Sequence, residues 1–187
     1  MVSFIRVSNG QLVQEREVSL QHDCLGISHR QGNLYITDGE TLYHYTVDVR
    51  LVRKIYRDTG HERTIKSCAV SPDGDRIYVI NQHSAKLVTL SRDGTVISTL
   101  PDPALQSSRL QTVTSCLHVT DSGQVLVCLP RSDTILQVDR DGREILAEVV
   151  TKNDGVTRPT SVYYSKHTRS LIVGMLHNND MIVFQAK

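Results

Sequence analysis

The residues of this sequence that could do chemistry are a few histidines and cysteines. His83 and His177 occupy equivalent loops of a repeat described below, and two imidazoles are half of a zinc site. No further His or carboxylate stands at a matching position, so we expect no metal site. Cys116 and His118 lie two residues apart, which on a strand places a thiol and an imidazole on one face. Such a pair can act as a nucleophile, but we interpret it as a packed thiol beside a core histidine.

The four cysteines are Cys24, Cys68, Cys116 and Cys128, and no two of them form a Cys-x-x-Cys pair. This spacing provides neither a zinc-finger ligand set nor a redox motif. Residues 1–7 lack the basic and apolar stretches of a signal peptide, so a secreted disulfide framework is not indicated. We therefore expect reduced thiols that pack inside strands, in a cytoplasmic protein.

The composition favours a strand-rich globular protein. Of the 187 residues, 39% are hydrophobic and 22% are charged, with a net charge of +1. This balance excludes a strongly basic nucleic-acid clamp and an acidic tail. No apolar run approaches the roughly 20 residues of a membrane helix. Val occurs 22 times and Ala only 5 times, and β-branched residues favour strands whereas Ala favours helices.

Four apolar triplets divide the sequence into similar segments. They begin at Leu34, Ile77, Val125 and Leu171, at intervals of about 46 residues. An apolar stretch and a turn precede each triplet, and a polar loop and a third strand follow it. A fourth strand follows in three of the segments. The innermost strands align Leu25, Cys68, Leu117 and Val162 as one column. Four short antiparallel strands in such a unit are the signature of a β-propeller blade.

We therefore predict an all-β chain in which residues 1–187 form a single, partial β-propeller domain of four-stranded antiparallel blades. The expected blades are 1–20 (partial), 21–58, 65–101, 112–150 and 158–187 (partial). Because the expected strands fit no whole number of blades, we expect an incomplete ring of the six-bladed type, with about four blades present. The open arc should expose apolar faces around Phe4, Ile5, Tyr163 and Tyr164. A small, imperfect four-bladed ring is the alternative.

The repeat resembles a known family. Residues 68–90, with Pro72-Asp73-Gly74 between two strands, look like an NHL repeat, and residues 177–184 are similar to its Asn-His-basic-aliphatic-x-Val-Phe segment. Ending on that segment is typical of the C-terminal NHL propellers of tripartite-motif (TRIM) proteins. The family's Asp after the second strand is kept as Asp38, whereas Asn81, Leu129 and Met175 stand elsewhere. The RING, B-box and coiled-coil portions of such proteins are absent from this chain.

The resemblance implies that the loops joining second to third strands, and the linkers between blades, share a partner-binding face. The residues expected on this face are His83, Lys86, Arg109, Arg131, Arg158, His177 and Asn178. Basic and acidic residues are nearly balanced across these loops, whereas an RNA-binding face should be clearly positive. The linkers also lack the aromatic residues on which bases stack.

We therefore expect a non-catalytic protein-interaction platform, the substrate- or partner-recruiting propeller of a TRIM-like, ubiquitin-ligase-type protein. This chain is not expected to be an enzyme, although a parent protein with an upstream RING domain could be a ubiquitin ligase. Its partners would be proteins, with no membrane association and no small-molecule cofactor. Single-stranded RNA binding by the same face, for post-transcriptional regulation, is the alternative. A metal-dependent propeller hydrolase or lyase is the third hypothesis, since the fold also supports enzymes.

Overall fold

The computed structural model describes residues 1–58, 64–105, 116–176 and 179–185. Three sheets have four antiparallel strands each, paired in chain order. The first blade contains β3 (Gly26–Arg30), β4 (Asn33–Thr37), β5 (Thr41–Thr46) and β6 (Leu51–Arg57). The second blade contains β7 (Ile65–Val70), β8 (Arg76–Asn81), β9 (Lys86–Ser91) and β10 (Val96–Pro101). The third blade contains β11 (Leu117–Val119), β12 (Val125–Leu129), β13 (Thr134–Val138) and β14 (Ile145–Val150).

Two smaller sheets lie at the ends of the described chain. The terminal blade has three strands: β15 (Pro159–Ser165), β16 (Ser170–Met175) and β17 (Met181–Gln185). The N-terminal hairpin has two: β1 (Val2–Ser8) and β2 (Gln11–Val18). Two short 3-10 helices, η1 (Pro103–Leu105) and η2 (Lys152–Asp154), follow β10 and β14. Among the described residues, no helix has the length and apolarity needed to cross a membrane.

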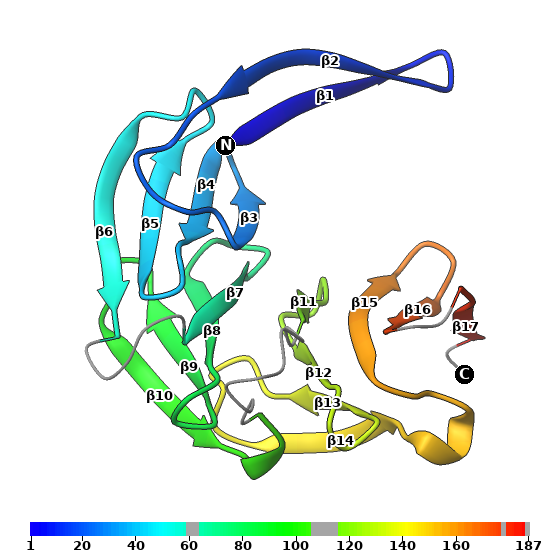
Figure 1. The fold of residues 1–187 in the computed structure, drawn as a ribbon. Coiled ribbons are helices and arrows are strands. Elements are labelled where there is room, and N and C mark those ends of the chain that lie inside the picture. Colours follow the sequence, from blue (N-terminus) through cyan, green and yellow to red (C-terminus); the bar gives the residue numbers. More distant parts are fainter. Residues whose placement is uncertain (59–63, 106–115, 177–178, 186–187) are drawn as a thin grey trace.

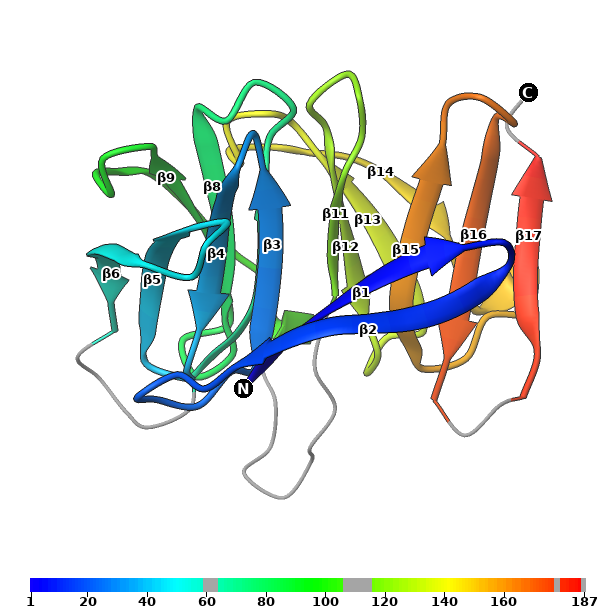
Figure 2. The ribbon, with the colours of Figure 1, turned by 90° about the horizontal axis from the view of Figure 1, so that it is seen from above.

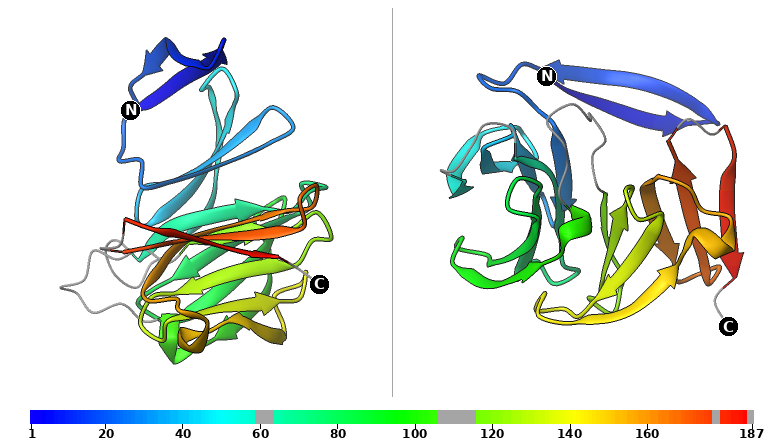
Figure 3. Two further views of the ribbon diagram at one scale, coloured as in Figure 1. Left: turned by 90° about the vertical axis from the view of Figure 1, so that its right-hand side faces the viewer. Right: turned by 60° about the horizontal axis from the view of Figure 1, so that its bottom comes forward.

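The sheets stand like blades around a common axis and together form an arc (Figure 1). The prediction of an all-β propeller with four-stranded antiparallel blades is confirmed. Within the described residues, the hairpin and the terminal blade form separate sheets, and the arc is open between them (Figure 1 and the left view of Figure 3). The two ends of the arc therefore do not complete each other's sheet.

The core lies in the joints between neighbouring blades, because second strands such as β8 and β12 are apolar on both faces. We call these the first joint (first and second blades), the second joint (second and third blades) and the third joint (third and terminal blades). Strand β12 is buried at every position, since blades cover both of its faces. Each joint has its own cluster of buried side chains, and a fourth cluster seats Val2 of the hairpin on the first blade. Successive blades are thus fastened by side-chain packing between separate sheets.

The open ends expose apolar side chains, as predicted. Ile5 of the hairpin is 56% exposed and Tyr163 of the terminal blade is 54% exposed. Phe4 and Tyr164 are half-buried, because Phe4 packs on the first blade and Tyr164 packs in the third joint. Uncovered apolar surface of this kind favours association.

One prediction about the innermost strands is wrong. Leu25 precedes β3 and is not part of the innermost strand. In the second blade Cys68 pairs with Val79, and the equivalent pair in the first blade is Ile27 with Ile36. Ile27 is 50% exposed, since its face points toward the open side of the arc. An alternating pattern permits this shift of two residues, because residues i and i+2 lie on the same face of a strand.

Candidate interaction face

The β4–β5, β8–β9 and β12–β13 loops lie at one end of the blades, together with the linker between β14 and β15 (the lower side in Figure 2). His83 and Arg131 lie in two of these loops and are exposed. Lys86 begins β9 and Arg158 immediately precedes β15, and both are half-buried. These four predicted residues therefore lie on one end of the molecule, which we call the interaction face. Arg109, His177 and Asn178 lie outside the described residues.

Side chains at the ends of the second strands shape the loops of this face. Asn81 Oδ1 accepts hydrogen bonds from the backbone N–H groups of His83 (3.1 Å) and Ser84 (3.0 Å). Its Nδ2 donates to Asp58 Oδ2 at 2.9 Å, in the linker between the first two blades. These bonds replace the backbone partners that a loop lacks. The loop backbone at His83 is therefore held by Asn81, a role that sequence reasoning treated only as a departure from the family's Asp.

A second contact ties the third blade to the terminal blade at this face. The Arg158 N–H donates to Asp133 Oδ1 at 2.7 Å, and the Leu176 N–H donates to the Arg158 carbonyl at 3.0 Å. Both Asp133 (φ 56°) and Arg158 (φ 46°) adopt the left-handed conformation that non-glycine residues rarely visit. The backbone beside Arg158 is thus held in a defined position by the neighbouring loop.

The first blade contributes a polar cluster that sequence reasoning missed. Asp38 Oδ1 accepts hydrogen bonds from the N–H groups of Glu40 (2.9 Å) and Thr41 (2.8 Å), and Oδ2 accepts one from the Tyr43 hydroxyl (2.7 Å). The His22 ring stacks on the Tyr43 ring, with 4.0 Å between centroids. The sequence does contain a sign of this cluster, since Tyr43 and Tyr45 alternate along a strand shortly after Asp38. The contact with His22 does not follow from this pattern, because His22 precedes β3 and only the fold places it against Tyr43.

The electrostatics of this cluster keep the carboxylate charged and the phenol neutral. Burial opposes ionisation of Asp38, but its hydrogen bonds from Glu40, Tyr43 and Thr41 lower its pKa below the usual value. Burial and the hydrogen bond to Asp38 raise the pKa of Tyr43 to about 12. A phenol that donates to a carboxylate and ionises only in strong alkali is a poor general base at neutral pH. The cluster is therefore suited to holding the loop.

Cys116 and His118, interpreted from the sequence as a packed thiol beside a core histidine, make separate contacts. Cys116 pairs with Cys128 on the adjacent strand, where the Cys128 N–H donates to the Cys116 carbonyl at 3.0 Å. The His118 ring instead contacts the Tyr163 ring, with centroids 5.0 Å apart. A hydrogen bond from the Cys128 thiol lowers the pKa of the Cys116 thiol to about 6. All four cysteines are free thiols, and Cys68 and Cys128 are buried as expected.

No metal-binding constellation is found in the part of the chain that the structure describes: three or more His, Cys, Asp or Glu side chains do not gather at any point. On the interaction face, Lys86, Arg131 and Arg158 lie among Asp58, Asp102 and Asp133. The described part of this face is therefore mixed in charge.

No family model matches the sequence, and a comparison with curated proteins found no match. Among solved structures, the virginiamycin B lyase of Staphylococcus aureus superimposes with a TM-score of 0.60 at 13% identity, over 88% of this chain and 56% of the lyase chain. The Dos1 propeller gives a TM-score of 0.64 at 9% identity, over 93% and 44% of the two chains. The computationally designed Ika4 protein gives 0.64 at 11% identity, over 90% and 94%.

This chain thus spans about half the length of the lyase and Dos1 chains. At such low identities the likeness shows the β-propeller fold alone, because one fold hosts many activities.

Proposed function

We propose that this chain is a non-catalytic protein-interaction platform, the partner-recruiting propeller of a TRIM-like, ubiquitin-ligase-type protein that acts in the cytoplasm. The observation that carries the proposal is the construction of the interaction face. Its carboxylates and amides, in Asp38, Asn81 and Asp133, are engaged in hydrogen bonds that fix loop backbone. Side chains such as His83 and Arg131 project from these fixed loops and are exposed. Rigid loops that present polar side chains favour binding, since little ordering is needed on association.

The charge of the face favours a protein partner over RNA. Single-stranded RNA is held by a continuous positive groove with aromatic platforms. The described part of the face alternates basic residues with Asp58, Asp102 and Asp133, which would repel phosphates. Mixed charge of this kind is common at the rim of protein interfaces and contributes to specificity.

A charge-reversal experiment with a matched control tests the proposal. The test variant combines His83→Ala with Arg131→Glu on the interaction face. The control variant combines His167→Ala with Lys166→Glu, two exposed residues in the β15–β16 turn at the other end of the blades. Both variants remove one His and reverse one basic residue.

Each protein is immobilised and used to capture partners from cell lysate, with nuclease treatment to remove RNA bridging. We expect a defined set of proteins that the control variant retains and the test variant loses at least about tenfold. Equal capture by both variants would contradict the proposed face. Capture abolished by nuclease, together with salt-dependent binding of a random RNA pool that the test variant loses, would assign the face to RNA instead.

A further inference from the structure

Cys116 and Cys128 stand directly opposite each other on neighbouring strands of the third blade. The antiparallel register of β11 and β12 pairs Leu117 with Val127, so Cys116, which immediately precedes β11, faces Cys128. The Cys128 N–H donates to the Cys116 carbonyl at 3.0 Å, as in a hydrogen-bonded pair of a ladder. Opposed residues project from the same face of a sheet, with about 4.5–5.5 Å between their Cβ atoms. The two thiols are therefore neighbours across the sheet.

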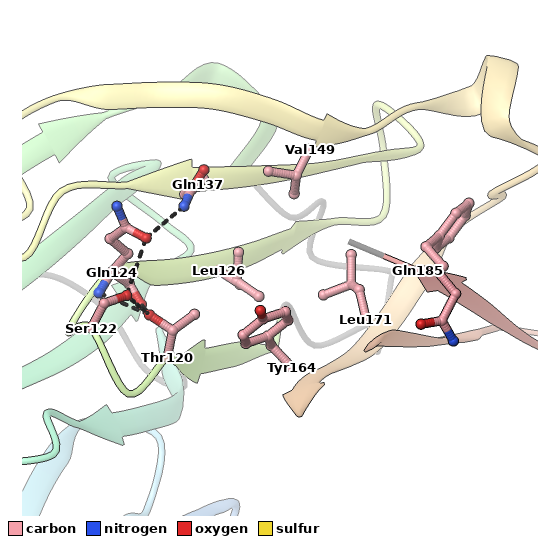
Figure 4. Close-up of a pocket in the computed structure, with 10 residues that line it drawn as sticks. Thr120, Ser122, Gln124, Leu126, Gln137, Val149, Tyr164, Leu171 and Gln185 are labelled. Atoms are coloured by element: carbon pink, nitrogen blue, oxygen red, sulfur yellow. Dashed lines mark hydrogen bonds between the residues drawn. The ribbon is translucent and has the colours of Figure 1, made fainter. Parts of the chain in front are cut away.

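The face of the sheet that carries both thiols is the one that packs on the terminal blade. Cys128 shares a face of β12 with Leu126, two residues earlier. Leu126 lies beside Leu171 and Tyr164 of the terminal blade, where the three residues line a pocket (Figure 4). The Cys128 side chain is fully buried in the third joint, whereas Cys116 is half-buried and packs against the same cluster. One residue of the pair is thus within reach of a small solute, while the other is enclosed.

The two thiols also differ in acidity. A hydrogen bond from the Cys128 thiol lowers the pKa of Cys116 to about 6, so the half-buried member of the pair is a thiolate at neutral pH. The hydrogen bond to Cys116 and burial raise the pKa of Cys128 well above its usual value, and the charge of the Cys116 thiolate adds to this rise. Oxidation of Cys116 would remove that charge, so Cys128 would then lose its proton more readily.

The other two cysteines of the chain provide internal controls. Cys68 pairs with Val79 in the second blade, and its thiol donates to the Tyr35 carbonyl at 3.4 Å. Burial raises the pKa of Cys68 to about 12. Cys24 is half-buried like Cys116, but burial raises its pKa. Cys24 therefore resembles Cys116 in exposure and differs from it in acidity.

We propose that Cys116 and Cys128 form an oxidation site, at which hydrogen peroxide closes a reversible disulfide at the open end of the β11–β12 hairpin. The opposed positions of the two residues and their unequal burial carry this proposal. The site goes beyond the proposed function, because it lies in the third joint and needs no binding partner. Loss of binding at the interaction face would leave it unaffected.

The oxidation proceeds in two balanced steps. The Cys116 thiolate attacks one peroxide oxygen: an S–O bond forms, the O–O bond breaks, and the departing hydroxide takes a proton to become water. The product is a sulfenic acid on Cys116. The Cys128 thiol then loses its proton and attacks that sulfur, so that the S–S bond forms, the S–O bond breaks and a second water leaves. In total the two residues lose two electrons, and one peroxide is reduced to two waters.

The ladder geometry predicts that this disulfide is easily reduced. Hydrogen-bonded antiparallel pairs hold their Cα atoms about 5.5 Å apart, within the range that disulfides span. Their Cβ atoms are about 4.5–5.5 Å apart, whereas a disulfide needs about 3.8 Å. Closing the bond therefore draws the two strands together and strains the ladder. Strained disulfides are reduced more readily than structural ones, and reduction restores both thiols.

Peptide mapping of the oxidised full chain tests the proposal. The reduced protein is treated with hydrogen peroxide at neutral pH, free thiols are blocked with N-ethylmaleimide, and unreduced digests are analysed by mass spectrometry. We expect one disulfide, between Cys116 and Cys128 of the same chain, with Cys24 and Cys68 recovered as blocked thiols. Cys116 should react at least about tenfold faster than Cys24, because far more of it is thiolate. Reduced glutathione should then reopen the disulfide.

Two variants separate this pair from unspecific oxidation. In Cys128→Ala the reaction should be slower, because Cys116 loses its hydrogen bond, and it should stop at the sulfenic acid, which dimedone traps. Cys24→Ser is the matched control and should form the same disulfide at an unchanged rate. Circular dichroism confirms that each variant is folded, and the map of the unaltered chain decides alone should Cys128→Ala not fold.

Four results would overturn the proposal. They are a disulfide to another cysteine or another chain, a disulfide that forms only in urea-unfolded protein, equal oxidation rates of Cys24 and Cys116, and a disulfide that reduced glutathione leaves intact.

Discussion

The turn at Gly142 provides a sharp test of how successive blades are fastened. Gly142 has φ +67°, and a Cβ there would overlap Thr89 Oγ1. The Gly142→Ala change therefore introduces two costs. Left-handed backbone costs a residue with a Cβ about 1–2 kcal/mol, and overpacking a close contact costs about 1–3 kcal/mol. We expect the free energy of unfolding to fall by about 2–5 kcal/mol.

A control glycine isolates the contribution of packing. Gly32 has φ +76°, but a Cβ there would meet nothing within 4 Å. Gly32→Ala should therefore cost only the backbone contribution of about 1–2 kcal/mol. The difference between the two variants measures the contact between blades. Urea unfolding followed by circular dichroism gives both values on one scale.

A second substitution should rescue the first. Thr89 Oγ1 is buried and makes no hydrogen bond within the described part of the chain, so its removal sacrifices no polar contact. In the Thr89→Ala background, Gly142→Ala should cost about 1–2 kcal/mol, giving a coupling of about 1–3 kcal/mol. If Gly142→Ala costs no more than Gly32→Ala, or if Thr89→Ala leaves the cost unchanged, the described seating of the turn on β9 is wrong.

Three further changes probe separate groups. Tyr78→Phe removes the hydrogen bond to the Arg140 carbonyl and should lower stability by about 1–2 kcal/mol in the same unfolding assay. The pKa of Asp38 is lowered in the folded protein, so its carboxylate stabilises the fold at any pH above its unfolded pKa of about 4. This stabilisation is lost as the pH falls through the folded pKa, and Asp38→Asn should therefore reduce the loss of stability that a stability–pH curve shows in acid. The Cys116 thiol should react with iodoacetamide with a midpoint near pH 6, and Cys128→Ala should move that midpoint upward; an unchanged midpoint would contradict the hydrogen bond.

Much of the fold follows from the sequence because a blade depends on local patterns. Apolar triplets such as the one at Ile77 mark second strands that two neighbours bury, and turns such as Asp93-Gly94 mark the hairpins. The register of the innermost strand could not be predicted from the apolar pattern alone. Leu25 and Ile27 are both apolar and share a face, so only pairing with Ile36 distinguishes them.

The candidate site was predictable in outline. Propeller topology brings His83, Lys86, Arg131 and Arg158 to one end, because all follow second strands or precede first strands. The contacts within that end were not predictable. The contact between Cys116 and Cys128 depends on the pairing of two strands, which the spacing of residues along one strand does not reveal.

Hydrogen–deuterium exchange on the complex with a captured partner tests the interaction face most directly. We expect the partner to slow exchange in peptides covering residues 82–85 and 130–133, the loops that carry His83 and Arg131. Residues 166–169, in the β15–β16 turn at the opposite end, should exchange as in the free protein. Protection confined to residues 166–169, or to the exposed hairpin β1–β2, would contradict the assignment of this face as the platform.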